Sequence, residues 1–253
     1  MHARLSVCFD QVADRYDASR GGVERGARIA ADVVPWLVPG RVLEVGVGTG
    51  IVAAALRARG RQVHGVDLSA AMLRRALDRL GPTVVQADAL ALPVASAALD
   101  NVLFVAALHV IGDVAGAVAE AARVLRPGGR LVAVYGVPKR EPADDDIGEV
   151  LAPLALLRGA RPDTPAAMDA AAAAAGLEPA GTGWVAPVRF AESPNTVADG
   201  IAERLWSYLW RVDERTWQAT VAPVISRLRA LPDPDRARGY VLSSRLVGYT
   251  RPE

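Results

Sequence analysis

The sequence predicts an α/β fold built on a doubly wound sheet of mostly parallel strands. Short apolar runs that end in turn residues or acids alternate with helix-length segments through the first half of the chain. This alternation is typical of parallel strands joined by right-handed crossovers. At 253 residues and 51% hydrophobic content, the chain can bury one such core with a small addition. Ligands of these sheets bind at the carboxyl ends of the strands.

The first predicted strand, 41–46, runs directly into three alternating glycines, Gly46, Gly48 and Gly50. Glycine accepts positive φ and has no Cβ, so such a turn brings backbone amides and carbonyls close to a ligand. The spacing departs from the G-x-G-x-x-G dinucleotide fingerprint, and no lysine follows as it would in a phosphate-binding loop. Glu44 precedes the turn, where it would repel phosphate and favour a cationic or zwitterionic ligand.

Four more strands are predicted in the first half, at 62–67, 83–87, 99–105 and 130–136. Ser69 is placed to cap a helix from Ala70 to Leu80. Before the last of these strands, the sequence Pro-Gly-Gly predicts the end of a helix and a chain reversal.

The second half is less regular. A helix is expected at 165–175, and extended segments are expected at 181–191 and 239–250. The acidic run 144–146 is read as a solvated helix start, because no histidine or second acid cluster nearby supports a metal site. Between the extended segments, Ser193-Pro194 opens a helical insertion.

The segment Glu44-Val-Gly-Val-Gly-Thr-Gly50 resembles motif I of the class I S-adenosylmethionine-dependent methyltransferases. Further segments match that family in order over residues 42–136, including a strand that ends in Asp67, the segment with Asp88, and the Pro-Gly-Gly turn. The resemblance implies a Rossmann-like, seven-stranded sheet with an N-terminal helical arm and a helical lid between the last two strands. It also implies S-adenosyl-L-methionine as cofactor, S-adenosyl-L-homocysteine as product, and no metal.

On this basis the chain is expected to be one methyltransferase domain, 1–253. Its expected parts are an arm at 1–35, a core at 36–192 and 233–253, and a lid at 193–232.

Two acids carry the expected cofactor contacts. Asp67 follows Gly50 by 17 residues, near the offset of roughly 20 at which dinucleotide folds place the acid that holds ribose hydroxyls. The resemblance makes Asp88 the acceptor for the adenine amino group. Each acid could instead be an ordinary turn residue. The full expected cofactor-binding set is Tyr16, Arg20, Glu44, Gly46, Gly48, Gly50, Asp67, Leu68, Met72, Asp88, Ala89 and Val105.

The arm contains Phe9-Asp-Gln-Val-Ala-Asp-Arg-Tyr16-Asp, which resembles the family's Phe-Asp-x-x-Ala-x-x-Tyr-Asp arm over the cofactor's amino-acid end. Tyr16 is accordingly a candidate for cofactor binding and catalysis. Phe9, Val12 and Tyr16 also recur at helical spacing, so a packing face is the alternative. Arg20 or Arg28 could pair with the cofactor carboxylate.

Candidates for the acceptor side are His109, Trp206 and Trp210. His109 is the best placed of three histidines to act as a base, although it could simply pack or cap a helix. The insertion holds three of the five tryptophans, which would either line a pocket for an apolar or ring-containing acceptor or anchor the helices.

Composition narrows the function classes. The net charge of +1, with scattered arginines, disfavours a nucleic-acid partner. The sequence has a single cysteine, Cys8, and no apolar secretory signal or membrane-spanning run, so a cytoplasmic protein is expected. The protein is also expected to be a monomer or a homodimer. The expected function is methyl transfer to a small-molecule acceptor, at O, N or C. The alternative is a fold relative that uses the cofactor non-catalytically, as a cyclase or a binding module.

Overall fold

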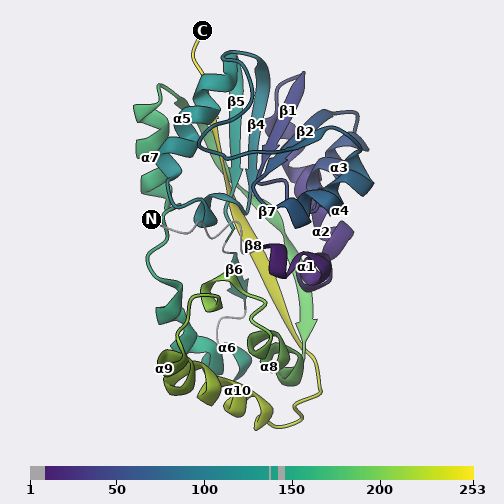
Figure 1. The fold of residues 1–253 in the computed structure, drawn as a ribbon, viewed down its shortest axis with the longest axis vertical. Coiled ribbons are helices and arrows are strands. Elements are labelled where there is room, and N and C mark those ends of the chain that lie inside the picture. The colour runs from purple at the N-terminus through teal and green to yellow at the C-terminus, as the bar shows by residue number, and fades with distance from the viewer. Residues whose placement is uncertain (1–8, 137, 142–145) are drawn as a thin grey trace. The chain divides into compact units, whose positions relative to one another are not determined.

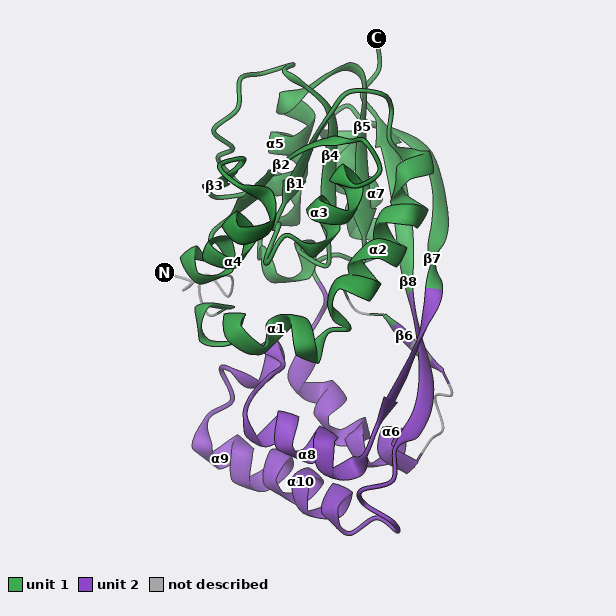
Figure 2. Ribbon diagram, turned by 90° about the vertical axis from the view of Figure 1, so that its right-hand side faces the viewer, with its two compact units in different colours: residues 1–138, 162–186, 244–253 green, residues 139–161, 187–243 purple. Residues whose placement is uncertain are grey.

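The computed structural model describes residues 9–136, 138–141 and 146–253 (Figure 1). Cys8, Asp144 and Asp145, which entered the expectations above, lie outside the described residues. The chain divides into two compact units, drawn in different colours in Figure 2. The first unit comprises residues 1–138, 162–186 and 244–253, and the second comprises residues 139–161 and 187–243.

The sheet has the order β3-β2-β1-β4-β5-β8-β6, and β7 also pairs with β8. Strands β1 to β5 pair in parallel, whereas β8 is antiparallel to β5. The predicted doubly wound, mostly parallel sheet is therefore confirmed, and all seven expected strands form. An eighth strand, β6, was not expected. The strands are β1 (Arg41–Val45), β2 (Gln62–Asp67), β3 (Val84–Gln86), β4 (Leu99–Val105), β5 (Leu125–Val134), β6 (Lys139–Glu141), β7 (Glu178–Glu192) and β8 (Arg238–Thr250).

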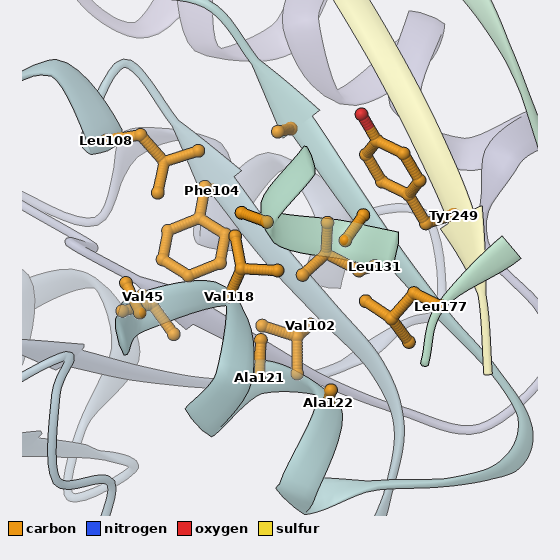
Figure 3. Close-up of a cluster of buried hydrophobic side chains, with 14 of the residues drawn as sticks. Val45, Val102, Phe104, Leu108, Val118, Ala121, Ala122, Leu131, Leu177 and Tyr249 are labelled. Atoms are coloured by element: carbon orange, nitrogen blue, oxygen red, sulfur yellow. The ribbon is translucent and has the colours of Figure 1, made fainter. Parts of the chain in front are cut away.

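Helices cover both faces of the sheet in the first unit (Figure 1). One face packs against α2 (Gly22–Val33), α3 (Ile51–Arg57) and α4 (Ala70–Leu80). The other packs against α5 (Val114–Val124) and α7 (Pro165–Ala174). Figure 3 shows the second of these cores, where Val102 and Phe104 of β4 lie among side chains of α5.

Strand β1 shows how the sequence distributes side chains between these two cores. Leu43 and Val45 belong to the core under α5, whereas Val42 belongs to the core under α2 and α3. Successive side chains of a strand point to opposite faces, so Glu44 shares the face of Val42. The acid that precedes the glycine turn therefore points into the side of the sheet covered by α2 and α3.

The Pro-Gly-Gly segment lies within β5, where it forms a bulge shortly after α5 ends. Leu99 pairs with Leu125, but the next paired residue of β4, Asn101, lies opposite Arg130. The intervening residues leave the ladder, and Gly128 takes the left-handed φ of +72° that the reversal needs. Strand β5 thus begins at Leu125, earlier than the sequence pattern indicated.

Trp36 connects the outer strands to the rest of the first unit. A Cβ added at Gly183 of β7 would lie 2.9 Å from the Trp36 ring, and one at Gly248 of β8 would lie 3.0 Å from it. Gly181 also faces this ring, at 3.3 Å. The three glycines leave room for an indole that lies across two neighbouring strands, and this contact requires the absence of side chains.

The second unit is helical and includes more than the expected insertion. Its core combines Ile147 and Leu154, from the segment before α7, with Ile201 and Leu209, from the insertion. Residues 139–161, which the sequence placed in the sheet core, are therefore part of the helical unit, because their apolar side chains find partners there. Its helical elements are α6 (Asp146–Leu151), η4 (Ala152–Arg158), α8 (Pro194–Ala202), η5 (Ser207–Leu209), α9 (Glu214–Thr216), a π-helical turn (Trp217–Val221) and α10 (Ala222–Arg229).

Candidate functional site

The glycine turn lies at the carboxyl end of β1, where it leads into α3. Gly46, Gly48 and Gly50 all have positive φ, at +75°, +56° and +80°. A Cβ at Gly46 would come within 2.6 Å of the Ala107 Cβ, so this glycine permits close approach of the chain after β4. At Gly48 the same construction meets no atom within 4 Å. The backbone of Gly48 is therefore the open part of the turn, where a ligand can approach.

Glu44 is buried behind this turn, with 2% of its surface exposed. Its Oε2 has no hydrogen-bond partner within the described part of the chain. Burial raises the pKa of Glu44 to about 8. The like charge of Asp67 also raises this pKa, whereas a hydrogen bond from the Ala53 amide lowers it. Glu44 is therefore mostly neutral near pH 7, which weakens the argument that it repels phosphate. Its contact with a cofactor stays a prediction.

Asp67 ends β2 beside the turn. Its Oδ2 accepts a hydrogen bond from the Gly48 amide at 2.8 Å, and its Oδ1 accepts one from the Ser69 amide at 2.9 Å. Burial raises the pKa of this carboxyl group, and these amide donors oppose the rise. Asp67 thus holds the open glycine in place. Each carboxylate oxygen can accept a second hydrogen bond, so ribose contacts remain possible in addition.

Asp88 lies in the loop after β3. Its Oδ1 accepts a hydrogen bond from the Leu90 amide at 3.0 Å, and its carbonyl accepts one from Ala91 at 3.0 Å. These bonds form an Asx-type turn, the local role that the sequence left open for this residue. Adenine recognition by Asp88 stays a prediction.

The remaining expected cofactor neighbours lie around these acids. Met72 is buried at 2% exposure in α4, and its amide donates to the capping Ser69 Oγ at 3.1 Å, as the sequence predicted for that cap. The Leu68 carbonyl accepts a hydrogen bond from Gln86 Nε2 at 3.0 Å, which joins the loop after β2 to the end of β3. Ala89 packs on the core under α5, and Val105 on the core under α2 and α3.

The arm contacts the site through acids that the sequence analysis did not single out. Asp10 Oδ1 accepts hydrogen bonds from Ser69 Oγ at 2.5 Å and from the Ala71 amide at 3.0 Å, at the start of α4. The arm helix α1 (Ala13–Ser19) adds Asp14, which pairs with Arg75 of α4. The arm is thereby fixed to the helix that follows Asp67.

Asp17 contacts the glycine turn itself. Its Oδ1 accepts a hydrogen bond from Thr49 Oγ1 at 2.5 Å, and Thr49 is 1% exposed. Its Oδ2 pairs with Arg79 at 2.7 Å, and Arg79 also donates to the Thr49 carbonyl at 2.7 Å. The acids at both ends of the quoted arm motif were the available signal for these contacts. Their partners lie far along the chain, which is why the sequence did not reveal them.

Tyr16 packs against Phe9, with ring centroids 6.0 Å apart at 73°. The Arg20 guanidinium lies 5.9 Å from the centre of the Tyr16 ring. These contacts match the packing role that the sequence allowed for Tyr16, and its roles in cofactor binding and catalysis stay predictions. Arg28 forms an exposed pair with Glu24 at 2.8 Å, and the pairing of Arg20 or Arg28 with the cofactor carboxylate stays a prediction.

His109 lies after β4, on a 3-10 turn (η3, Leu108–Val110). Helix α5 begins only at Val114, and Asp113 caps it with a side chain that accepts a hydrogen bond from the Gly116 amide at 2.8 Å. Ala106 has a left-handed φ of +51°, which turns the chain off the strand before the helix can start. His109 is half-buried and lies against Gly136, at the end of β5.

Trp206 and Trp210 belong to the helical unit. Trp206 packs so closely on Gly200 that a Cβ there would lie 3.0 Å from its ring. Trp210 donates its ring N–H to the Arg204 carbonyl at 2.7 Å, and the Arg204 guanidinium lies 4.0 Å from the Trp217 ring centre. These contacts stabilise the unit. Acceptor binding by Trp206 and Trp210 stays a prediction.

Two general findings complete the description. Among the described residues, no group of three or more His, Cys, Asp or Glu side chains is arranged to hold a metal ion. None of the helices in the described ranges is long and apolar enough to cross a membrane.

The chain has a Rossmann-like fold of the kind that solved S-adenosylmethionine-dependent methyltransferases have, with a glycine turn held by Asp67 at the end of β1. Residues 43–133 match a family model described as a methyltransferase domain.

One similar curated protein is the demethylmenaquinone methyltransferase of Thermus thermophilus, 38% identical over 142 residues. That match covers 51% of this chain and 64% of the relative. The chain spans 57 to 64% of the length of the first such relatives.

Solved structures share the fold at low identity. A Thermotoga maritima S-adenosylmethionine-dependent methyltransferase, described as a possible histamine N-methyltransferase, superposes with a TM-score of 0.58 at 19% identity, over 98% of this chain and 99% of that one. The (4+2)-cyclase SpnF superposes with a TM-score of 0.56 at 20% identity, over 95% of each chain. The fold alone therefore accommodates both methyl transfer and cyclisation.

Proposed function

We propose that this protein transfers the methyl group of S-adenosyl-L-methionine to a small-molecule acceptor and releases S-adenosyl-L-homocysteine. The observation that carries the proposal is the glycine turn held by Asp67, within the segment that matches the methyltransferase domain. The cofactor supplies an electrophilic methyl group on its sulfonium. The protein has to orient the acceptor atom opposite the sulfur and exclude water.

The residues around the turn fit this cofactor. Gly48 leaves the space that a Cβ would fill, so the methionine part of the cofactor can approach its backbone. Asp67 offers free acceptor capacity to the ribose hydroxyls, and Asp88 would accept from the adenine amino group. On the arm, Tyr16 and Arg20 would meet the amino-acid end, with the Arg20 guanidinium pairing with the carboxylate.

For the acceptor, we favour an apolar, ring-containing molecule bound by Trp206 and Trp210. The tryptophans of the insertion support this class, and so does the similarity to a protein named demethylmenaquinone methyltransferase. A double variant, Trp206→Phe with Trp210→Phe, keeps much of the helical packing, and it is expected to raise KM for the acceptor with little change in cofactor affinity. An unchanged KM in a folded variant would refute this assignment.

If the acceptor atom carries a proton, His109 would remove it. General acid-base catalysis contributes about 100- to 10,000-fold to rate, so His109→Ala is expected to lose a factor in that range from kcat and to lose the corresponding inflection in the pH profile. A variant with an unchanged profile would remove His109 from the mechanism.

The deciding experiment has two readouts. Calorimetric titration with S-adenosyl-L-methionine tests binding, and a panel of acceptors incubated with methyl-labelled cofactor tests transfer, followed as S-adenosyl-L-homocysteine release. Label in the acceptor supports the proposal. Binding with acceptor turnover but without label transfer indicates the alternative, a cyclase-like use of the cofactor, which the fold shared with SpnF supports. No binding refutes both.

A further inference from the structure

The side chain of His109 lies against Gly136. A Cβ built on Gly136 would lie 2.2 Å from His109 Nδ1 and 2.3 Å from its Cε1. Carbon atoms at such distances overlap with the ring, so the imidazole occupies the volume that any side chain at position 136 would need. The two residues follow different strands, β4 and β5, and meet at the carboxyl edge of the sheet.

Glycine at position 136 is not required by the backbone there. Its φ lies outside the left-handed range that the other turn glycines of this edge adopt, so alanine could take the same conformation. The Ala106 Cα lies 3.0 Å from the constructed Cβ, farther away than the two imidazole atoms. The imidazole therefore makes the closest contact with a side chain at this position.

Ala106 supplies the other side of this arrangement. Its left-handed φ of +51° turns the chain off β4, while its amide still donates to the Val134 carbonyl of β5 at 2.9 Å. The strained residue therefore brings the His109 turn over the end of β5, where Gly136 receives the ring.

We propose that Gly136 is a positioning residue that sets the orientation of the His109 imidazole for proton removal from the acceptor. This inference rests on the proposed function. The Nδ1 edge of the ring is buried against Gly136, so the residue at position 136 determines where the ring lies. A methyl group at position 136 displaces the ring from that place.

The test compares Gly136→Ala with His109→Ala and with a matched control, Gly239→Ala. At Gly239, as at Gly136, the backbone is outside the left-handed range, but the nearest atom to a constructed Cβ is 4.0 Å away. The first readout is the set of imidazole NMR signals of the cofactor-free protein, and only three histidines have to be assigned. The second is kcat against pH, with KM and cofactor affinity measured alongside.

Gly136→Ala is expected to shift the His109 signals, to lower kcat by about tenfold or more, and to displace the inflection in the pH profile. Cofactor affinity should stay within about twofold of the parent, and Gly239→Ala should behave as the parent in every readout. Unchanged His109 signals, or shifted signals with an unchanged kcat profile, would overturn the positioning role.

A further measurement, of stability, tests the contact even if Gly136→Ala folds poorly. Removal of the imidazole makes room for the methyl group, so the double variant Gly136→Ala with His109→Ala should be more stable than Gly136→Ala alone. Equal stability refutes the contact. If His109→Ala leaves turnover intact, the base role in the proposed function fails, whereas loss in His109→Ala without loss in Gly136→Ala contradicts only the present inference.

Discussion

Glu44→Gln is expected to stabilise the protein increasingly as pH rises. Glu44 is 2% exposed and one of its oxygens has no partner among the described residues, so its charged form is poorly accommodated in the folded state. Glutamine has nearly the same shape and can still accept the hydrogen bond from the Ala53 amide, but it cannot ionise. The substitution therefore removes the ionisable carboxyl group and changes little else in the folded protein.

The magnitude follows from the pKa of Glu44, which burial raises from 4.5 to about 8 in the folded protein. Below the unfolded value, both states carry the proton and the group has no effect on the pH dependence. Between the two values only the unfolded state loses it, so the folded state loses about 1.4 kcal/mol of stability per pH unit. The loss reaches about 3 kcal/mol at pH 7 and about 5 kcal/mol above pH 8.

The assay is urea unfolding of both proteins at several pH values from 5 to 9. The quantity of interest is the free energy of unfolding of Glu44→Gln minus that of the parent, in which the contributions of other titrating groups largely cancel. We expect this difference to rise by about 1.4 kcal/mol per unit up to pH 8 and then to level off. A difference that is independent of pH would show that Glu44 is ionised in the folded protein and would refute the reasoning.

Three further substitutions test other contacts. Asp67→Asn should weaken S-adenosyl-L-methionine binding by about 10- to 100-fold, measured by calorimetry, because it removes a charged acceptor worth about 1.5–3 kcal/mol; an unchanged Kd would contradict its role. Asp17→Asn breaks the pair with Arg79 and should make the arm more sensitive to limited proteolysis while the melting temperature changes little, and equal cleavage rates would argue against the arm contact. Trp36→Ala should destabilise the protein by about 3 kcal/mol in urea unfolding, because it empties the space beside the glycines of β7 and β8. A loss of stability below about 1 kcal/mol would contradict that packing.

The parts of the fold that could be predicted have local signals. Buried parallel strands such as β1 and β4 consist mostly of apolar residues, and Ser69 caps its helix through a bond to an amide three residues away. In contrast, β6 is the short polar segment Lys139–Glu141, which exists only because β8 pairs with it. The 3-10 turn at His109 depends on the left-handed φ of Ala106. An alanine in the sequence gives no sign of that conformation.

The candidate site divides in the same way. The sequence pattern located the glycine turn and Asp67, because they follow or end two consecutive strands. The turn lies at the end of β1, and Asp67 is the last residue of β2. The contacts of Asp10 and Asp17 with α4 and the turn, and that of His109 with Gly136, join segments far apart in the chain. A single sequence carries no signal for such pairs beyond the residue types involved.

The pairing of β5 with β8 has a consequence for the order of folding during synthesis. Arg130 of β5 lies opposite Thr250, near the end of the last strand, and Val134 lies opposite Leu246. While the ribosome makes the intervening helical segments, β5 has an unpaired apolar edge that could pair with another nascent chain. The residues of the second unit emerge before that edge is closed. Completion of the sheet is therefore a late, long-range step, and chaperones that protect exposed strand edges should influence the yield of folded protein.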